Sequence, residues 1–183
     1  MATIRLIPSA YSLSSTSYLS VSSASNMYNN TDNTTYATVT NSRTSTTSYY
    51  IYLSGFNFDD IPAGSIVNSF TIKLKASESG VSTSDSYKPY LVNNTTAING
   101  SCSAITTTVT TNTFTGITAD WDTISGYGSN FGIRINCRRA SRNTTSYMYI
   151  YGAEILVDYT MPTYYSVTAA SSSSAIDSVS PAT

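Results

Sequence analysis

Two aspartates beside the single tryptophan are the side chains of this chain best suited to chemistry. Asp120 and Asp122 flank Trp121, and residues two positions apart on an extended chain project to the same side. A carboxylate pair next to an aromatic ring suits sugar hydrolysis, and its oxygens would also suit a stabilising calcium ion. Asp in a loop is more often a turn former or a cap. We therefore assign no catalytic, metal or cofactor role here and expect Asp120, Trp121 and Asp122 to contact a glycan or a partner protein.

The remaining acids and bases offer little else for catalysis. Asp59 and Asp60 are adjacent, so on an extended chain they point to opposite faces, and Glu78 and Glu154 are the only glutamates. The chain has no histidine, which removes Ser-His-Asp, Cys-His and histidine-metal chemistry together. We expect a protein that is not an enzyme.

Four of the six arginines lie between positions 134 and 142. Arg134, Arg138, Arg139 and Arg142 form a candidate docking patch for an acidic partner, and the alternative is a solvated strand face and hairpin. The net charge of the whole chain is -1, which is not the basic footprint that nucleic-acid backbones require. No run of 18 apolar residues occurs, and the start lacks the pattern of a secretory signal. We therefore expect a soluble, leaderless protein with neither nucleic acid nor membrane among its partners.

Two cysteines, Cys102 and Cys137, are too few for a disulfide framework or a zinc site. Cys137 continues the inward parity of the strand before it, which favours a buried thiol that packs as a small apolar group. A bridge to Cys102 stays open as the alternative.

Composition predicts an all-β protein. The chain has 33 serines, 29 threonines and 16 tyrosines, while charged residues make up only 10%. Thr, Tyr, Val and Ile favour strands, and Ser, Asn and Gly favour turns. We predict about eight strands at the regular spacing of an antiparallel two-sheet β-sandwich of jelly-roll type.

Alternation then predicts which side chains line the core, because successive residues of a strand point to opposite faces. We expect a bend at Gly152, and about half of the tyrosine rings should fill the interior. The predicted inward sets are Ile66, Phe70, Ile72, Leu74 and Ala76, then Phe131, Ile133, Ile135 and Cys137, and finally Tyr147, Tyr149, Tyr151, Ala153, Ile155, Val157 and Tyr159.

The chain divides into three parts by composition. Residues 1–20 are polar with short apolar islands and predict an arm or an edge strand. Residues 21–162 carry the alternating segments and predict the β-sandwich domain. Residues 163–183 are rich in serine and predict a linker or extended tail that leads to a further β module.

Several short segments resemble a β-sandwich module in structural proteins of tailed-phage virions. The match spans roughly residues 35–160 and departs after Ile66, where Asn68-Ser69-Phe70 replaces the usual glycine-isoleucine pair. The matching segments are Thr35-Tyr36-Ala37-Thr38-Val39, Gly55-Phe56-Asn57-Phe58, Ile61-Pro62-Ala63-Gly64-Ser65-Ile66, Phe131-Gly132-Ile133-Arg134-Ile135 and residues 149–159.

The resemblance implies a virion surface protein, either a head decoration or fibre or a tail or baseplate component. It brings no catalytic residues, and it places the chain in the virion after assembly in the host cytoplasm. Its partners would be other capsid or tail proteins and copies of itself, a trimer being one such arrangement, which would cover open sheet edges. Two alternatives stay open: a carbohydrate-binding or adhesin module that uses Trp121 on a host glycan, and a glycan hydrolase that uses Asp120 or Asp122.

Overall fold

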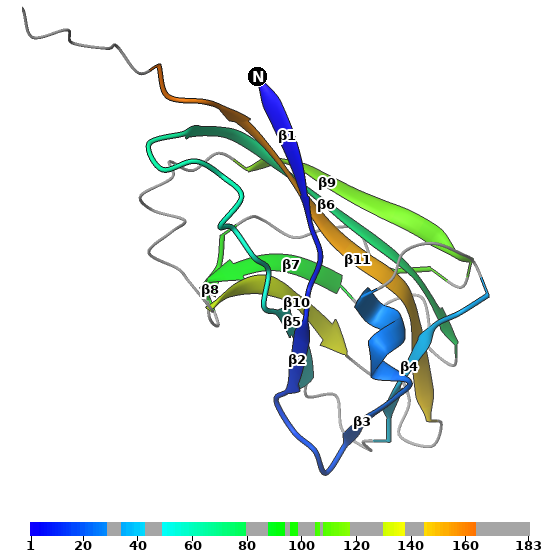
Figure 1. Cartoon of the computed structure of the whole chain (residues 1–183). Coiled ribbons are helices and arrows are strands. Elements are labelled where there is room, and N and C mark those ends of the chain that lie inside the picture. Colours follow the sequence, from blue (N-terminus) through cyan, green and yellow to red (C-terminus); the bar gives the residue numbers. More distant parts are fainter. Residues whose placement is uncertain are drawn as a thin grey trace, which may run out of the picture.

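The computed structural model describes residues 1–28, 34–42, 49–79, 88–93, 96–98, 105–106, 108–117, 130–137 and 145–163. In this part of the chain the protein is all-β, with two antiparallel sheets packed face to face (Figure 1) and one short 3₁₀ turn, η1 (Ala24–Tyr28). Sheet A contains β1 (Ala2–Leu6), β3 (Leu19–Ser22), β4 (Ala37–Asn41), β6 (Ile66–Ser79), β9 (Thr110–Ile117) and β11 (Ser146–Thr160). Sheet B contains β2 (Ala10–Leu13), β5 (Tyr49–Ser54), β7 (Lys88–Asn93), β8 (Thr96–Ala97) and β10 (Phe131–Cys137).

The strand order confirms the predicted jelly roll. Sheet A runs β3-β4-β11-β6-β9 and sheet B runs β2-β5-β10-β7-β8. From β4 onward each connection except the β7–β8 hairpin crosses between two four-stranded arrays, β4-β11-β6-β9 and β5-β10-β7-β8. This is the double-sheet arrangement of a jelly roll. The prediction of about eight strands is close to the eleven that the described part of the chain contains.

The first residues of the chain join both sheets. β1 pairs with β11 in sheet A, and β2 pairs with β5 at the edge of sheet B. Figure 1 shows this segment crossing from one layer to the other. A pair of tight turns follows β5: Gly55 and Gly64 have φ values of 74° and 79°, a conformation that favours glycine, and between them the chain returns to sheet A.

The core lies between the sheets and follows the predicted alternation in several strands. In β10, Phe131, Ile133, Ile135 and Cys137 are all buried, and Arg134 and Asn136 lie on the other face. One buried polar contact crosses the core, because Asn41 Nδ2 donates to the carbonyl oxygen of Cys137 at 2.9 Å and so joins β4 to β10.

The inward parity predicted for β6 is wrong at its first residue. Phe70, Ile72, Leu74 and Ala76 are buried as expected, but Ile66 is 63% exposed. A β-bulge is the reason: β11 pairs Asp158 with Ser69 and Tyr159 with Val67, so one extra residue stands between them. An extra residue moves every preceding side chain to the other face. Val67 therefore takes the place in the core that Ile66 was expected to fill.

A second bulge overturns the parity predicted for the first half of β11. β6 pairs Ala76 with Ile150 and Lys75 with Gly152, leaving Tyr151 as the extra residue. This bulge lies directly beside Gly152, where a bend is expected. Before it, Met148 and Ile150 face the core; after it, the core side chains are Ala153, Ile155, Val157 and Tyr159.

Most tyrosines in the described part of the chain lie outside the core, where about half were predicted to fill it. Tyr147 lies on the outer face and is 36% exposed. Among the twelve tyrosines in the described part of the chain, Tyr151 and Tyr159 alone are classed as buried. Aliphatic side chains and phenylalanines fill the interior instead.

Two carboxylates on the outer face of sheet A tie three strands together. Glu154 on β11 forms ion pairs with Arg5 of β1 and with Lys73 of β6, the latter at 3.6 Å. Asp158 accepts hydrogen bonds from Thr3 at 2.6 Å and from Ser69 at 3.1 Å. These contacts hold the N-terminal strand against the long central strand.

Replacing Glu154 with glutamine should lower the free energy of unfolding by about 1 kcal/mol, because it removes two ion pairs whose cations remain partly exposed. Urea titrations of the wild type and the variant would measure this difference. Asp60→Asn, a neutralised carboxylate on an exposed turn, is the control and should cost almost nothing. Equal effects of the two variants would contradict a specific role for the Glu154 pairs.

Cys137 is the buried thiol that the alternation predicts. It is completely buried and is a free cysteine, and burial raises its pKa to about 12. Cys102 lies outside the described residues.

The raised pKa of Cys137 makes stability depend on pH in the alkaline range. Below the unfolded pKa near 9.0 the thiol is protonated in both states. Above it the unfolded chain loses the proton while the folded chain keeps it, so stability falls as pH rises toward the folded pKa, by up to about 1.4 kcal/mol per pH unit. Urea titrations between pH 8 and pH 10.5 should show a shallower decline for Cys137→Ala. The difference in slope isolates Cys137, since all tyrosines are common to both chains; identical slopes would contradict the assignment.

Candidate binding faces

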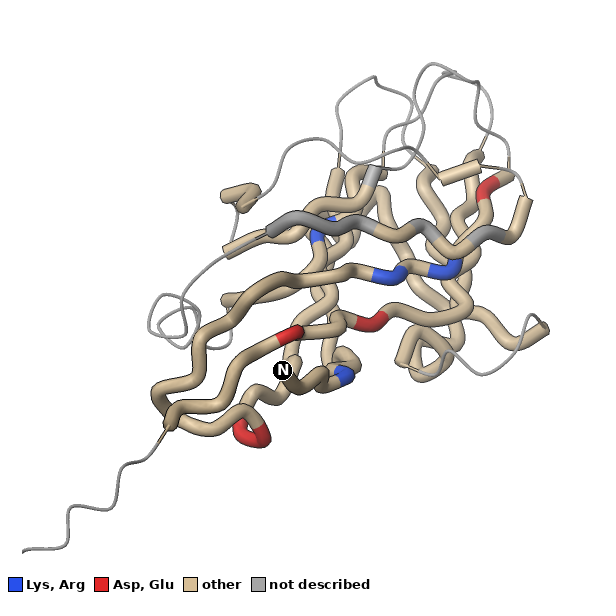
Figure 2. The backbone as a smooth tube through the Cα atoms, turned by 90° about the horizontal axis from the view of Figure 1, so that it is seen from above, with Lys and Arg blue, Asp and Glu red and all other residues tan. Residues whose placement is uncertain are grey.

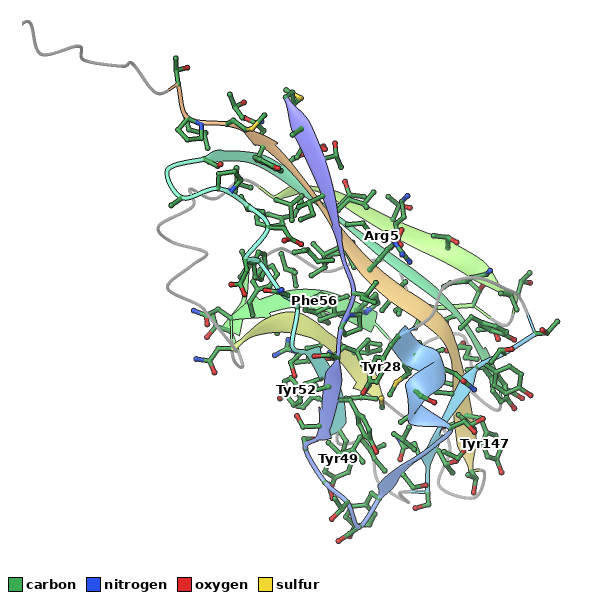
Figure 3. All side chains as sticks on the ribbon, in the orientation of Figure 1. Arg5, Tyr28, Tyr49, Tyr52, Phe56 and Tyr147 are labelled. Carbon is green, nitrogen blue, oxygen red and sulfur yellow. The ribbon has the colours of Figure 1, made fainter. Side chains whose placement is uncertain are left out.

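The outer face of sheet A carries a row of tyrosines that we call the tyrosine ridge: Tyr36, Tyr147, Tyr149 and Tyr151. The rings of Tyr147 and Tyr149 are stacked with centroids 6.5 Å apart. Tyr36 packs edge-on against Tyr149 and Tyr151, at 5.0 and 5.2 Å. Tyr36 and Tyr147 are 40% and 36% exposed, and Figure 3 shows Tyr147 near one end of the long strand β11.

Hydroxyl side chains border the tyrosine ridge on both sides. In β4, Thr38 pairs with Tyr149 and Thr40 pairs with Tyr147. In β6, Ser77 and Ser79 stand opposite the same two tyrosines. The ridge and its immediate borders in β4 and β6 are therefore aromatic and polar but uncharged. The nearest charged residue on this face by strand register is Lys75, which stands opposite Gly152, and Glu154 and Asp158 lie further along β11.

Sheet B presents a different outer face, with Arg134 at its centre. Arg134 lies on β10 between β5 and β7, directly opposite Tyr52 on one side and Tyr90 on the other. Its guanidinium carbon lies 5.0 Å from the centroid of the Tyr50 ring and 4.9 Å from that of Tyr90. Contacts of this length between a cation and an aromatic face are attractive, so two tyrosines hold the arginine in place.

Tyr52 and Asn136 complete this group, which we call the Arg134 patch: Tyr50, Tyr52, Tyr90, Arg134 and Asn136. The Tyr50 and Tyr52 ring centroids are 6.1 Å apart. Burial raises the pKa of Tyr52, while the charge of Arg134 acts in the opposite direction. The Oδ1 atom of Asn136 is buried and has no hydrogen-bond partner in the described part of the chain.

The structure tests only part of the predicted sites. Asp120, Trp121 and Asp122 lie outside the described residues, as do Arg138, Arg139 and Arg142. Arg134 faces outward, as its parity predicts. In the described ranges, no group of three or more Cys, Asp or Glu residues is placed to hold a metal ion.

Neither the tyrosine ridge nor the Arg134 patch is evident in the sequence. The ridge depends on the bulge at Tyr151, and the patch depends on pairing between strands that are far apart in the chain. Alternation within β5 does place Tyr50 and Tyr52 on one face. This shared face is the part of the Arg134 patch that the sequence could have predicted.

No protein-family model matches the chain, and no curated protein matches its sequence. No helix in the described ranges is sufficiently long and apolar to cross a membrane.

Proposed function

We propose that this chain is a structural protein of the tailed-phage virion surface, a head decoration or fibre or a tail or baseplate component, that acts by binding other proteins. It would assemble in the host cytoplasm and remain in the particle. The double-sheet jelly roll is a fold that viral capsid proteins use, which is an analogy at the level of fold. The resemblance of residues 35–160 to virion modules points the same way.

The observation that carries the proposal is the tyrosine ridge. Tyrosine is enriched at protein interfaces, where its ring supplies contact area and its hydroxyl supplies a hydrogen bond. Charged residues are depleted at the centres of such interfaces, and the ridge and its Ser and Thr borders carry no charge. A neighbouring subunit of the particle, or a copy of this chain, is the partner that this face fits.

Particle composition is the direct test of the virion assignment. Mass spectrometry of washed, density-banded phage particles from cells that produce the chain should find its peptides in a fixed ratio to the major capsid or tail protein. Recovery of the chain only in the soluble fraction of the lysate would contradict the proposal.

The role of the tyrosine ridge is tested by a matched pair of double variants. Tyr36→Ser with Tyr147→Ser removes rings that are 40% and 36% exposed, whereas Tyr18→Ser with Tyr11→Ser removes rings that are 39% and 36% exposed elsewhere. Sedimentation equilibrium of the wild type should give a multiple of 19.6 kDa. We expect the ridge variant to lose both self-association and incorporation into particles and the control to keep them. Equal behaviour of the two variants would contradict an interface at the ridge.

A further inference from the structure

We propose that the Arg134 patch on the outer face of sheet B is a binding site for carboxylated polysaccharides. This site is separate from the tyrosine ridge, lies on the other sheet and does not depend on the virion assignment. The proposal rests on four observations: the arrangement of Arg134 between tyrosines, the distribution of charge over the two sheets, the tyrosine rings and the unpartnered acceptor of Asn136, and the position of the patch in the middle of the sheet.

The arrangement of Arg134 suits recognition of a carboxylate. A guanidinium whose faces contact aromatic rings directs its N–H groups in its own plane, and those N–H groups pair with both oxygens of a carboxylate. Tyr50 and Tyr90, each about 5 Å from the guanidinium carbon, restrict the side chain before any ligand binds. A side chain that is already ordered loses less entropy on binding.

Charge is distributed unequally between the sheets. The five strands of sheet B contain Lys88 and Arg134 and no acidic residue, whereas in sheet A the acids Glu78, Glu154 and Asp158 are matched by Arg5, Lys73 and Lys75. Figure 2 shows how sparse the charged positions are along the described backbone. Because the net charge of the chain is -1, the whole protein does not attract anions, and an anion is attracted locally at Arg134.

The tyrosine rings and the Asn136 amide of the patch indicate that the ligand that carries the carboxylate is a sugar. Tyr50, Tyr52 and Tyr90 offer partly exposed rings on which the apolar face of a pyranose ring can pack while the tyrosine hydroxyls reach its polar rim. Asn136 leaves a buried acceptor without a partner in the described part of the chain. Such an atom costs free energy, and a sugar hydroxyl would satisfy it after rotation of the amide.

The position of the patch argues against two other anionic ligands. An acidic peptide that binds by strand addition needs a sheet edge, whereas β10 is paired on both sides, with β5 and β7. A nucleic acid needs several cations along its backbone, whereas Arg134 is the one cation whose side chain the structure places in this patch. A single carboxylate on a sugar ring matches a single arginine among tyrosines.

The test compares charged and neutral forms of the same sugars. The full-length protein is titrated by calorimetry with oligomers of polygalacturonate, alginate, hyaluronan and polysialic acid, and with the methyl esters of the galacturonate oligomers. We expect saturable binding to at least one carboxylated series and binding about tenfold weaker or absent for its neutral form, since charge-assisted hydrogen bonds are lost. Absence of binding to all four series, or equal binding of acid and ester, would overturn the proposal.

Variants assign the binding to the patch. Arg134→Gln should weaken binding about tenfold or more, and Arg134→Lys, which keeps the charge but loses the planar fork, should also weaken it. Lys75→Gln removes one positive charge from the outer face of sheet A and is the matched control, expected to bind within about twofold of the wild type. Circular dichroism and thermal unfolding establish that each variant is folded. Equal losses in Arg134→Gln and Lys75→Gln, or tighter binding of poly-glutamate or single-stranded DNA than of any sugar, would contradict a glycan site.

Discussion

Replacing Phe131 with alanine is expected to lower the free energy of unfolding by about 4 kcal/mol. Phe131 is 1% exposed, and its ring packs against Phe58, Phe70 and Phe56, with centroids 5.0, 5.6 and 6.4 Å away. Phe70 belongs to sheet A, Phe131 to sheet B, and Phe56 and Phe58 to the segment between β5 and β6. Urea titration followed by tyrosine fluorescence would measure the loss.

The size of this effect follows from where the ring lies. Figure 3 places Phe56 between the two layers, so removal of the Phe131 ring opens a cavity at a point where both sheets and the connecting segment meet. The cost in stability is the lost transfer free energy of the removed ring plus a cost for the cavity, because rigid sheets cannot collapse to fill it. A loss of about 4 kcal/mol is a large share of the 5–15 kcal/mol that stabilise a typical domain.

Two further substitutions make the Phe131 prediction specific. Phe131→Leu keeps most of the volume and should cost about 1.5 kcal/mol. Ile66→Ala removes an apolar side chain that alternation assigns to the core but that the β6 bulge turns outward, and it should cost less than about 0.5 kcal/mol. A loss of 2 kcal/mol or more in Ile66→Ala, or a small loss in Phe131→Ala, would contradict the packing described above.

Bulges explain why alternation predicts some strands of this protein and not others. β10 has unbroken pairing with both neighbours, and every inward residue predicted for it is buried. β6 and β11 each contain one extra residue, and each shift by one residue exchanges the faces. Tyrosine and threonine tolerate either face, so the amphipathic stretch from Tyr147 to Tyr151 gives no warning that its parity differs from the stretch that follows.

Long-range pairing explains the rest of the difference between sequence and structure. Parity places Arg134 on an outer face, but its tyrosine neighbours come from β5 and β7, about 80 and 40 residues earlier in the chain. No local pattern predicts which strands become neighbours in a jelly roll, since most of its connections cross from one sheet to the other. The general fold class followed from composition and turns, while the two candidate binding faces required the register of the strands.

The two outer faces give the domain two different surfaces. The tyrosine ridge is uncharged and lies on sheet A, and the Arg134 patch is cationic and lies on sheet B, with the core between them. A domain that docks on a particle through the ridge would present the Arg134 patch away from that contact. Under this arrangement, loss of glycan binding in Arg134→Gln would leave incorporation into particles unchanged, and loss of incorporation in the ridge variant would leave glycan binding unchanged.

Replacing Gly132 with alanine is expected to lower the free energy of unfolding by about 3 kcal/mol. A Cβ atom on Gly132 would lie 2.2 Å from the carbonyl oxygen and 3.3 Å from the carbonyl carbon of Leu53. These are backbone atoms of the neighbouring strand β5, and Gly132 itself stands in β10, so relief of the clash requires two central strands of sheet B to separate. Thermal unfolding followed by circular dichroism would measure the loss.

Gly64→Ala separates this steric effect from the ordinary cost of replacing a glycine. Gly64 has a φ of 79°, but an added Cβ would lie 3.6 Å from Pro162, an ordinary contact, so its substitution should cost about 1 kcal/mol through backbone conformation alone. Gly132 does not have a positive φ, so the larger loss of stability in Gly132→Ala would come from the clash with β5.

Because Arg134 and its tyrosines depend on the same pairing of β5 with β10, Gly132→Ala should also weaken carboxylated-glycan binding in the protein that remains folded. If Gly132→Ala lowers the free energy of unfolding no more than Gly64→Ala does, the close approach of Leu53 to Gly132 described above would be contradicted.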